Sequence, residues 1–388
     1  MICAQTEADV IDAVQAARAK SCTLEIVGAG TKRAYGRPMA CDDVLDVSAL
    51  SGIVKYEPAE LILTVLPGTP VTEITTLLDS KSQRLGFEPA DWGPLLGTSE
   101  GNATIGGVVS ADVNGAAAVR YGRARDSLLG LRAVNGLGEA YKAGGKVVKN
   151  VTGFDLPKLV CGAMGTLGVL TEMTLRVYPK PPQSVSLIVR DLNVEEGFAL
   201  LRRVWQSPLE ATALAYIPAS MPLAQLGYVG EGAALIRLEG AHAPLKEKIA
   251  ALLGVARSAQ QIEASNIFSA ISGGTIFAGK DCDLWRVSVP PAEAADIVRR
   301  VGSSVFAADG AGGLLWIGLD AGGNGVALRK LCETAGGQAT LVKADDDTRR
   351  GVAPFTPEPP ARRALTKSVK AAFDPQNIFN PGRMWKAV

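Results

Sequence analysis

A glycine-rich stretch follows the first strand-like run of the chain, and its residue types are suited to binding phosphate. The sequence IVGAGTKRAYG fills residues 26–36, where the apolar run ends at Val27 and the next residues are Gly28, Ala29, Gly30 and Thr31. Small residues allow a backbone to close around phosphate oxygens, which its N–H groups then bind. A tight turn without any ligand produces the same pattern, so residues elsewhere must decide between the two interpretations.

The stretch differs from the fingerprint of a nicotinamide dinucleotide fold. That fingerprint needs G-x-G-x-x-G opening directly into a helix, because the third glycine allows close packing of helix on strand. In this chain Arg33 holds the third position, and a loop-like sequence with Gly36 and Pro38 follows it. The sequence therefore gives little support to a nicotinamide cofactor.

Composition and the scarcity of histidine exclude several classes of function. Lys and Arg number 40 against 39 Asp and Glu, so the chain lacks the positive field that nucleic acid binding needs. The six cysteines lie far apart without a C-x-x-C pair, which predicts neither an iron-sulfur cluster nor zinc nor a redox dithiol. His242 is the one histidine, and its sequence EGAHAPL predicts a solvated loop. We therefore expect no metal site and no Ser-His-Asp triad.

The sequence up to about residue 180 predicts mixed helices and strands that position the glycine-rich stretches. We expect strands at 23–27, 44–48, 53–57 and 61–66 and helices at 6–20 and from Thr69–Pro70 to Leu78, the first capped by Thr6. Hairpin turns explain the glycines at 136, 138, 144 and 145. They do not explain Gly106 and Gly107 in TIGGVVSA, where side chains would be preferred. We interpret this pair as a close approach of ligand to backbone.

The proline-rich stretch YPKPPQS at 178–184 predicts a boundary between a domain at 1–180 and one at 181–350. Over the second domain the pattern predicts an α+β fold with a largely antiparallel sheet. The expected strands are 186–190, 211–217, 234–240, 284–290, 313–319 and 338–344, and the expected helices are 193–206, 244–254, 291–302 and 326–337. The last part, 351–388, contains a helix at about 361–373 and the turn Asn380-Pro381-Gly382, which predict a segment that docks back onto the protein.

Hydropathy predicts a cytoplasmic protein. The N-terminal sequence lacks the charged and apolar regions of a signal peptide. The longest apolar run, residues 159–170, is shorter than the ~20 residues that span a bilayer.

Five stretches of the chain, taken in order, resemble the FAD-linked oxidases of the vanillyl-alcohol oxidase type, which have a PCMH-type FAD-binding domain. They are IVGAGT, VLPGTPVTEI, TIGGVVSADVNG with RYGRARDSLLGL, KVVKNVTGFDLPKLVCGAMGTLGVLTEMTL and FDPQNIFNPGR. The similarity is strongest to the FAD-binding subunits of bacterial glycolate oxidase (GlcE type) and is weak over 185–350. It implies an FAD-binding domain of two α/β subdomains and a second, α+β cap domain.

The resemblance also implies which residues bind FAD. They are Gly28, Ala29, Gly30, Thr31 and Lys32 at the diphosphate; Pro67 and Gly68 at the adenine; Thr104, Ile105, Gly106, Gly107, Ser110, Ala111 and Gly115 along the diphosphate and ribityl chain; and Gly165, Thr166, Leu167, Gly168 and Val169 at the adenosine half. Relatives that attach FAD covalently use a histidine or cysteine in or near the diphosphate loop. This chain has Lys32, Arg33, Ala34 and Tyr35 there, so we expect noncovalent FAD.

The resemblance implies the FAD-binding subunit of a glycolate oxidase-like complex. Its partners would be a larger FAD-dependent catalytic subunit and an iron-sulfur subunit, its substrate glycolate or D-lactate, and its attachment to the inner membrane peripheral through the complex. Arg120, Arg123, Lys149 and Arg383 are candidates to hold a substrate carboxylate, but no base accompanies them, so no catalytic residue is assigned. Two alternatives stay open: a self-sufficient FAD-dependent 2-hydroxy-acid dehydrogenase, and a non-catalytic scaffold of the same fold.

Overall fold

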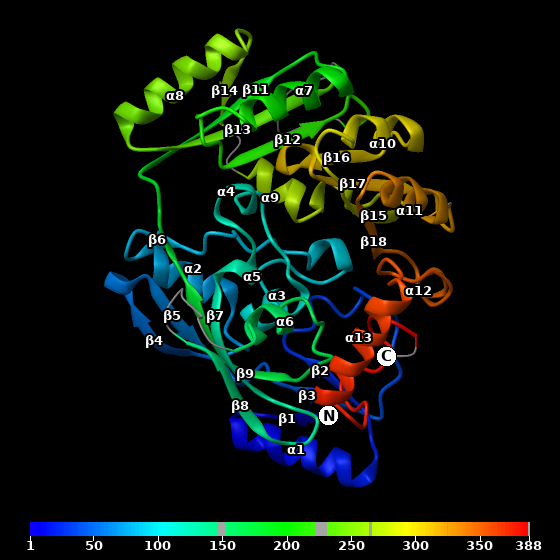
Figure 1. Cartoon of the computed structure of the whole chain (residues 1–388). Coiled ribbons are helices and arrows are strands. Elements are labelled where there is room, and N and C mark those ends of the chain that lie inside the picture. The colour runs from blue at the N-terminus through cyan, green and yellow to red at the C-terminus, as the bar shows by residue number, and fades with distance from the viewer. Residues whose placement is uncertain (146–152, 222–230, 264–265, 324, 387–388) are drawn as a thin grey trace. The chain divides into compact units, whose positions relative to one another are not determined.

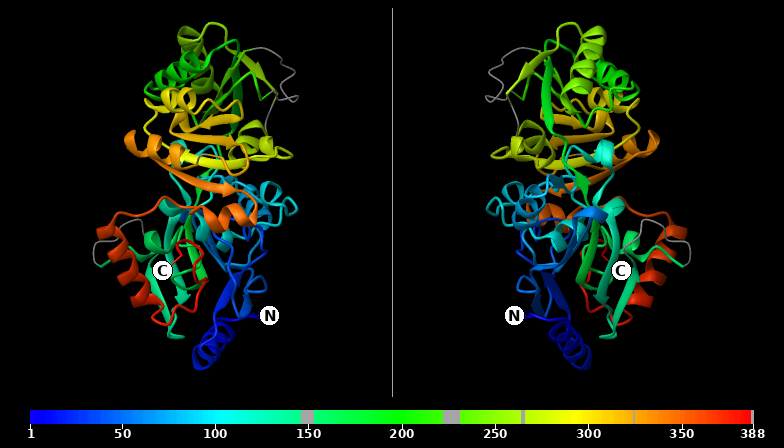
Figure 2. Two further views of the ribbon diagram at one scale, coloured as in Figure 1. Left: turned by 90° about the vertical axis from the view of Figure 1, so that its right-hand side faces the viewer. Right: turned by 90° about the vertical axis from the view of Figure 1, so that its left-hand side faces the viewer.

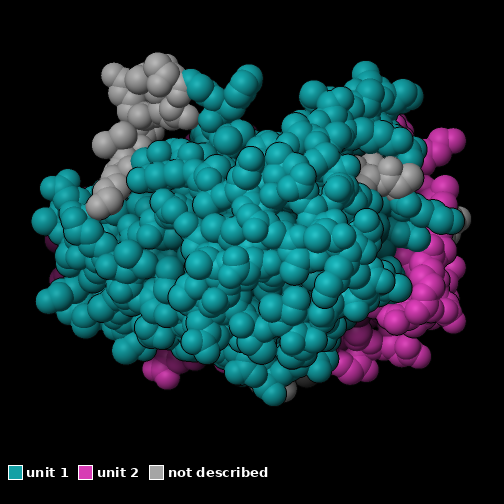
Figure 3. Space-filling view, turned by 90° about the horizontal axis from the view of Figure 1, so that it is seen from below, with its two compact units in different colours: residues 1–114, 122–180, 357–388 teal, residues 115–121, 181–356 magenta. Residues whose placement is uncertain are grey.

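The computed structural model describes residues 1–145, 153–221, 231–263, 266–323 and 325–386. The chain divides into two compact units, coloured separately in Figure 3. Unit 1 comprises residues 1–114, 122–180 and 357–388, and unit 2 comprises residues 115–121 and 181–356. Among the described residues, no helix combines the length and the hydropathy needed to cross a membrane.

A small parallel sheet forms the first part of unit 1. Its strands lie in the order β1 (Ile2–Cys3), β3 (Asp43–Asp46) and β2 (Leu24–Val27). Helix α1 (Glu7–Lys20) packs on it, and Figure 1 shows this helix in dark blue beside β1. Thr6 accepts a hydrogen bond from the Asp9 N–H, and the Asp9 carboxylate accepts one from the Thr6 N–H, which together form a capping box. The predicted helix and its cap are confirmed.

A five-stranded antiparallel sheet forms the second part of unit 1, in the order β4-β5-β9-β7-β8. The strands are β4 (Ile53–Glu57), β5 (Ile62–Val65), β7 (Leu128–Val134), β8 (Ala140–Gly144) and β9 (Val169–Arg176). Helices α2 (Val71–Asp79), α3 (Ile105–Ala111) and α6 (Leu156–Val160) bury their apolar side chains against one face of this sheet. Short elements complete the unit: β6 (Gln83–Arg84), β10 (Tyr178–Pro179) and α5 (Ala124–Ser127). The two sheets of unit 1 agree with the predicted pair of α/β subdomains.

The carboxyl-terminal segment returns to the first sheet of unit 1. After α13 (Pro360–Phe373), the backbone of Leu24 in β2 donates to Ile378 O at 2.8 Å and accepts from Asn380 N at 3.0 Å. Asp374 lies at the turn between helix and strand edge, where its carboxylate accepts from the N–H groups of Ile378 and Phe379. The carboxyl-terminal segment therefore extends this sheet at its β2 edge, and strand β1 forms the opposite edge.

Unit 2 contains an eight-stranded sheet in which every pairing is antiparallel, which confirms the predicted sheet type. Its order is β14 (Gln260–Ile262), β11 (Gln183–Val189), β13 (Ala233–Gly240), β12 (Ala213–Ile217), β16 (Phe306–Asp309), β17 (Leu314–Leu319), β15 (Asp283–Ser288) and β18 (Gln338–Lys343). Four helices, which Figure 2 shows on one face of the sheet, are α7 (Val194–Trp205), α8 (His242–Val255), α10 (Ala294–Val301) and α11 (Gly325–Thr334). The remaining helices are α4 (Ala118–Tyr121), α9 (Ile267–Ser272) and α12 (Asp346–Gly351).

Two features of unit 2 differ from the sequence prediction. The prediction omits β14, β16, α9 and α12, each only three to six residues long, because such short segments contain too few residues to show a period. His242 is the first residue of α8 and not a loop residue. Its side chain is exposed, and its Nδ1 lies 3.3 Å from the Gln183 side-chain oxygen.

Candidate functional site

Two adjoining hollows of about 80 Å³ and 90 Å³ lie in unit 1 beside the glycine-rich loop that follows β2. Ile26, Gly28, Thr104, Gly107, Ser110, Met164 and Asn380 line both of them. We call the combined hollow the glycine groove. Four regions of the sequence therefore form most of its walls: the loop 28–33, helix α3 with its cap, the turn at 164–169 and the turn at 380–383.

Two buried cationic side chains distinguish the groove. Lys32 and Arg383 both line it, and each is only 8% exposed. The Lys32 ammonium donates to Thr31 Oγ1 at 3.1 Å, and the Arg383 guanidinium donates to the backbone oxygen of Lys32 at 2.6 Å. Burial lowers the pKa of Lys32 to about 8, and the charge of Asp91 opposes this shift only in part. Because buried charges need a counter-charge or a ligand, this wall is suited to an anion.

The acidic residue of the groove does not supply that counter-charge. Glu25 lines the groove, but its carboxylate pairs with the Arg33 guanidinium, whose Nε donates to Oε1 at 2.9 Å. Glu25 and Arg33 therefore neutralise each other in a partly exposed ion pair. Lys32 and Arg383 therefore give the groove its net positive character.

Glycine is required where the loop after β2 approaches α3. A Cβ atom at Gly28 would lie 2.8 Å from Thr104 Oγ1, and Gly30 has a φ of +73°, which other residues rarely adopt. The loop is a series of turns in which Arg33 N donates to Gly30 O at 3.1 Å and Tyr35 N to Lys32 O at 3.0 Å. The expectation of a loop, and not a helix start, is therefore correct.

The two glycines of TIGGVVSA, Gly106 and Gly107, have different surroundings. The stretch is helix α3, capped by Thr104, so the glycines lie in its first turn. A Cβ at Gly106 would lie 2.6 Å from Pro67 Cβ and 2.8 Å from Pro67 O, so this glycine is needed for packing. A Cβ at Gly107 would meet only Thr104 Oγ1 at 3.3 Å and Lys32 Nζ at 4.0 Å. Only Gly107 therefore leaves room for a ligand near the lysine.

Most of the residues expected to bind the cofactor line the groove. They are Gly28, Ala29, Gly30, Thr31, Lys32, Pro67, Thr104, Gly106, Gly107, Ser110, Ala111, Gly165, Gly168 and Val169. Five others lie elsewhere: Gly68, Ile105, Gly115, Thr166 and Leu167.

The five residues outside the groove have other environments. A Cβ at Gly68 would lie 2.3 Å from Ser48 O and 2.7 Å from Val47 O, so close backbone packing requires that glycine. Ile105 is fully buried in the apolar core of unit 1. Gly115 belongs to the short stretch that is part of unit 2. Thr166 and Leu167 line a separate, apolar cavity.

Sequence reasoning missed Asn380 and Met164 and considered Arg383 only as a candidate to hold a substrate carboxylate. The Asn380 side chain accepts from Ile26 N at 2.9 Å and donates to Met164 O at 2.7 Å, so it fastens β2 to the turn at 164–169. Arg383, considered only as a clamp for substrate, lines the groove beside Lys32. The turn sequence Asn-Pro-Gly-Arg was the available signal, because a tight turn places its first and last side chains near each other.

The other proposed anion clamps are engaged elsewhere. Arg120 pairs with Glu210, and Arg123 pairs with Asp112 at 2.8 Å. Lys149 lies outside the described residues. Within the described ranges, no group of three or more His, Cys, Asp and Glu side chains is arranged to hold a metal ion.

Comparisons with known proteins agree with an FAD-binding interpretation of the groove. A family model described as FAD binding domain matches residues 1–144, and one described as FAD linked oxidases, C-terminal domain, matches residues 358–384. The second match includes Asn380 and Arg383.

Curated relatives include a protein that matches nearly the whole chain. The chain is 32% identical over 381 residues to the glycolate oxidase subunit GlcE of Escherichia coli, covering 97% of this chain and 96% of that protein. It is 31% identical over 169 residues to the glycolate oxidase subunit GlcD of Bacillus subtilis, covering 43% of this chain and 34% of that protein.

Solved structures share the fold. A p-cresol methylhydroxylase with bound substrate superimposes with a TM-score of 0.71 at 17% identity, covering 98% of this chain and 88% of that one. An alkyldihydroxyacetonephosphate synthase superimposes with a TM-score of 0.67 at 15% identity, covering 98% and 75%. At such low identity these likenesses concern the fold alone.

Proposed function

The chain belongs to the family of GlcE-type glycolate oxidase subunits, which makes it an FAD-linked oxidoreductase, and from this premise we propose that it is the FAD-binding subunit of a glycolate oxidase-like complex. The complex oxidises a small 2-hydroxy acid such as glycolate or D-lactate to the 2-oxo acid. Electrons then pass to an iron-sulfur partner. The other partner is a larger, FAD-dependent catalytic subunit, and the complex lies in the cytoplasm or at the inner membrane surface.

The observation that carries the proposal is the buried pair of cations in the glycine groove, found in a chain that matches a GlcE protein over nearly its full length. A diphosphate would place negative charge beside the buried Lys32 ammonium, and the Arg383 guanidinium lines the same groove. The glycines at 28, 30 and 107 provide the close backbone approach that a diphosphate needs. The fit between these residues and the FAD diphosphate supports noncovalent binding at this place.

The residues of this chain have separate tasks in that binding. Lys32 and Arg383 neutralise the diphosphate, and Asn380 holds the turn at 164–169 against β2 so that the groove keeps its shape. When bound, FAD supplies a hydride acceptor for 2-hydroxy-acid oxidation. Oxidation of a 2-hydroxy acid also needs a base for the hydroxyl proton and a cation for the carboxylate. Arg120 and Arg123, the exposed candidates for the carboxylate, already pair with Glu210 and Asp112.

The chain has cations in the groove for the cofactor, whereas its exposed candidates for the substrate carboxylate, Arg120 and Arg123, are already paired. This contrast supports a subunit role over a self-sufficient dehydrogenase. Two relatives whose printed names contain the word subunit, GlcE and GlcD, support the same choice. The larger FAD-dependent subunit then contributes the groups that act on substrate.

The test is anaerobic mixing of the purified chain with glycolate or D-lactate, followed by flavin absorbance. We expect little bleaching with the isolated chain. Co-expression with the larger FAD-linked subunit and the iron-sulfur subunit of the same organism should give a complex that bleaches rapidly. Fast and complete bleaching of the isolated chain would contradict the subunit role and favour the self-sufficient dehydrogenase. A purified chain that binds no added FAD would favour the scaffold.

A further inference from the structure

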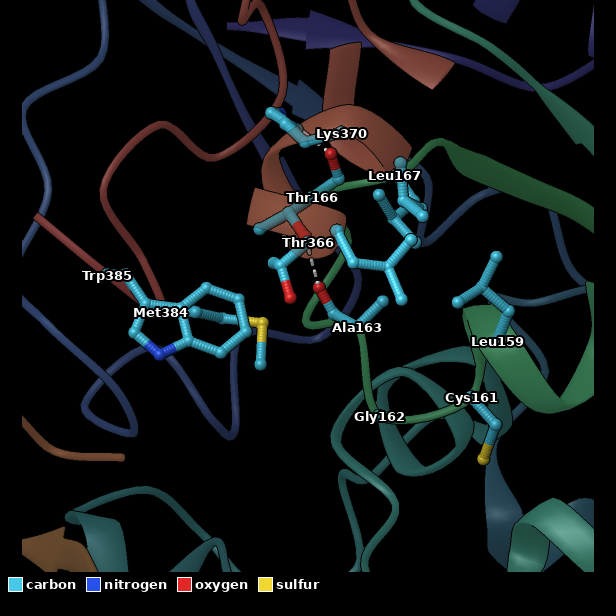
Figure 4. A pocket seen from close by; sticks show the side chains of 12 residues that line it. Leu159, Cys161, Gly162, Ala163, Thr166, Leu167, Thr366, Lys370, Met384 and Trp385 are labelled. Carbon is cyan, nitrogen blue, oxygen red and sulfur yellow. Dashed lines mark hydrogen bonds between the residues drawn. The ribbon is translucent and has the colours of Figure 1, made fainter. Parts of the chain in front are cut away.

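An apolar cavity of about 260 Å³ lies in unit 1 next to the glycine groove. Figure 4 shows Met384 and Trp385 on one side of it, Leu159 on the opposite side, and Thr366 and Lys370 of α13 above. The other lining residues come from the turn at 161–167 and from α13. The cavity is therefore enclosed by α6, that turn, α13 and the last described residues of the chain.

Three polar side chains in the cavity wall, those of Lys370, Thr166 and Cys161, already have partners. The Lys370 ammonium donates to Asp374 Oδ2 at 2.6 Å, to Thr166 O at 2.7 Å and to Phe379 O at 3.1 Å. The Thr166 hydroxyl donates to Ala163 O at 2.6 Å, and the Cys161 thiol donates to Val109 O at 3.3 Å. Because these groups are satisfied within the protein, the cavity is suited to an apolar occupant.

The rim of the cavity exposes large apolar side chains. Leu365 of α13 is 65% exposed and Leu159 of α6 is 39% exposed, and both line the cavity. Phe154, in the connection that leads into α6, is 90% exposed. Exposed apolar groups around a concave centre are typical of protein interfaces, where an anchor side chain enters a pocket.

Positive charge lies beside this apolar rim, on α13. Helix α13 contains four basic residues and no acidic residue, and its Arg362, Arg363 and Lys367 are exposed. Asp155, before α6, and Glu358, before α13, are already bonded: Asp155 pairs with Lys158 at 2.8 Å, and Glu358 accepts from the Thr366 hydroxyl at 3.0 Å. A partner surface that matches this one is acidic around an apolar anchor.

From these observations we propose that the apolar cavity receives an apolar side chain from an acidic segment of a partner subunit. The inference rests on the proposed function, which requires such partners, and it assigns a docking surface to α13, α6 and Trp385. A volume of about 260 Å³ is below the ~300–1,000 Å³ typical of small-molecule sites, which favours a single side chain as occupant.

The position of the cavity connects docking to the cofactor site. Along the turn, Met164 and Gly165 line the glycine groove, whereas Ala163 and Thr166 line the apolar cavity. Arg383 likewise lines the groove, and the adjacent Met384 lines the cavity. A partner side chain in the cavity therefore contacts the same two segments that hold the cofactor.

The test compares two aspartate variants at exposed apolar positions. Leu365→Asp changes the rim, and Val326→Asp on α11 of unit 2, where the side chain is 75% exposed, is the matched control. The affinity of each purified chain for the co-expressed larger FAD-linked subunit and iron-sulfur subunit is measured by biolayer interferometry. We expect Leu365→Asp to weaken association about tenfold or more and Val326→Asp to change it less than twofold. FAD content of the isolated variants should equal that of the wild type.

Charge reversal provides an independent measurement. The double variant Arg363→Glu with Lys367→Glu should slow association and remove most of its salt dependence, because both residues are exposed. If both Leu365→Asp and the double variant bind the partner subunits with wild-type affinity, the docking inference is wrong, but the proposed complex still stands. A wild-type chain that forms no complex would overturn the proposed function together with the inference. A chain that instead dimerises through Leu365, seen by light scattering, would assign the cavity to a second copy and overturn the partner proposed here.

Discussion

Substitution of Gly107 should lower FAD affinity without unfolding the protein. A Cβ atom at this position points toward Lys32 Nζ at 4.0 Å and meets no backbone atom, with Thr104 Oγ1 its nearest neighbour at 3.3 Å. Alanine also has a higher helix propensity than glycine, by at most about 1 kcal/mol. We therefore expect Gly107→Ala to leave the stability of the apoprotein unchanged or to raise it by less than about 1 kcal/mol.

The effect on FAD should have the opposite sign. The added methyl group occupies the space between the loop 28–33 and α3, so a diphosphate bound there must move away from Lys32. Loss of one hydrogen bond to a charged group amounts to about 1.5–3 kcal/mol, which is roughly a tenfold to 150-fold rise in Kd. Gly107→Val, with two more methyl groups, should abolish stable FAD retention during purification.

Gly106→Ala is the matched contrast one residue away. Its Cβ would lie 2.6 Å from Pro67 Cβ, so overpacking should destabilise the apoprotein by about 1–3 kcal/mol. The assays are thermal unfolding of the apoprotein and titration with FAD followed by flavin fluorescence. Wild-type FAD affinity in Gly107→Val would refute the assignment of the groove to the diphosphate.

Three further predictions concern charge and attachment. Because burial lowers the pKa of Lys32 to about 8, FAD affinity should be constant below about pH 7 and fall as pH rises through 8, where the free lysine loses its proton; Lys32→Met should weaken binding and remove this dependence in the same titration. Acid precipitation should release the flavin into the supernatant, and yellow colour kept in the pellet would contradict noncovalent attachment. Asp374→Ala should lower the free energy of unfolding in urea by about 3–5 kcal/mol, because it leaves the buried Lys370 without its carboxylate. The exposed control Asp296→Ala should change it by less than about 1 kcal/mol, and equal effects would show that burial is unimportant here.

Elements with strong local signals were predictable from the sequence. The capping residues Thr6 and Asp9 and the four apolar positions of α1 that are buried mark that helix. Strands β2 to β5 of unit 1 and most strands of unit 2 also follow from their apolar patterns, whereas β7, β8 and β9 lie outside the predicted strands. The proline-rich stretch near residue 180 coincides with a change of unit. These features depend on neighbours in the sequence, so local reasoning is sufficient for them.

The individual roles of the glycines were not predictable, because their causes lie in remote segments. Gly68 approaches the carbonyls of Val47 and Ser48, and Gly106 approaches Pro67, whereas only Gly107 opens into the groove. In the sequence, Gly106 and Gly107 are adjacent and chemically identical. Only the packing of α3 on the segment after β5 separates a glycine required for folding from one that leaves space for a ligand.

The carboxyl-terminal segment explains why a nearly neutral chain forms an anion site. The net charge of +1 gives no sign of such a site, because it sums all 40 cationic and 39 acidic side chains and says nothing of where any of them lies. The groove becomes positive because Arg383 is brought beside Lys32, more than 350 positions earlier, by the turn that follows Asp374. Asp374 fixes that turn through Ile378 N and Phe379 N, and Asn380 then joins β2. If FAD binds in the glycine groove as proposed, its affinity depends on the docking of residues 374–383, because that docking brings the Arg383 guanidinium into the groove.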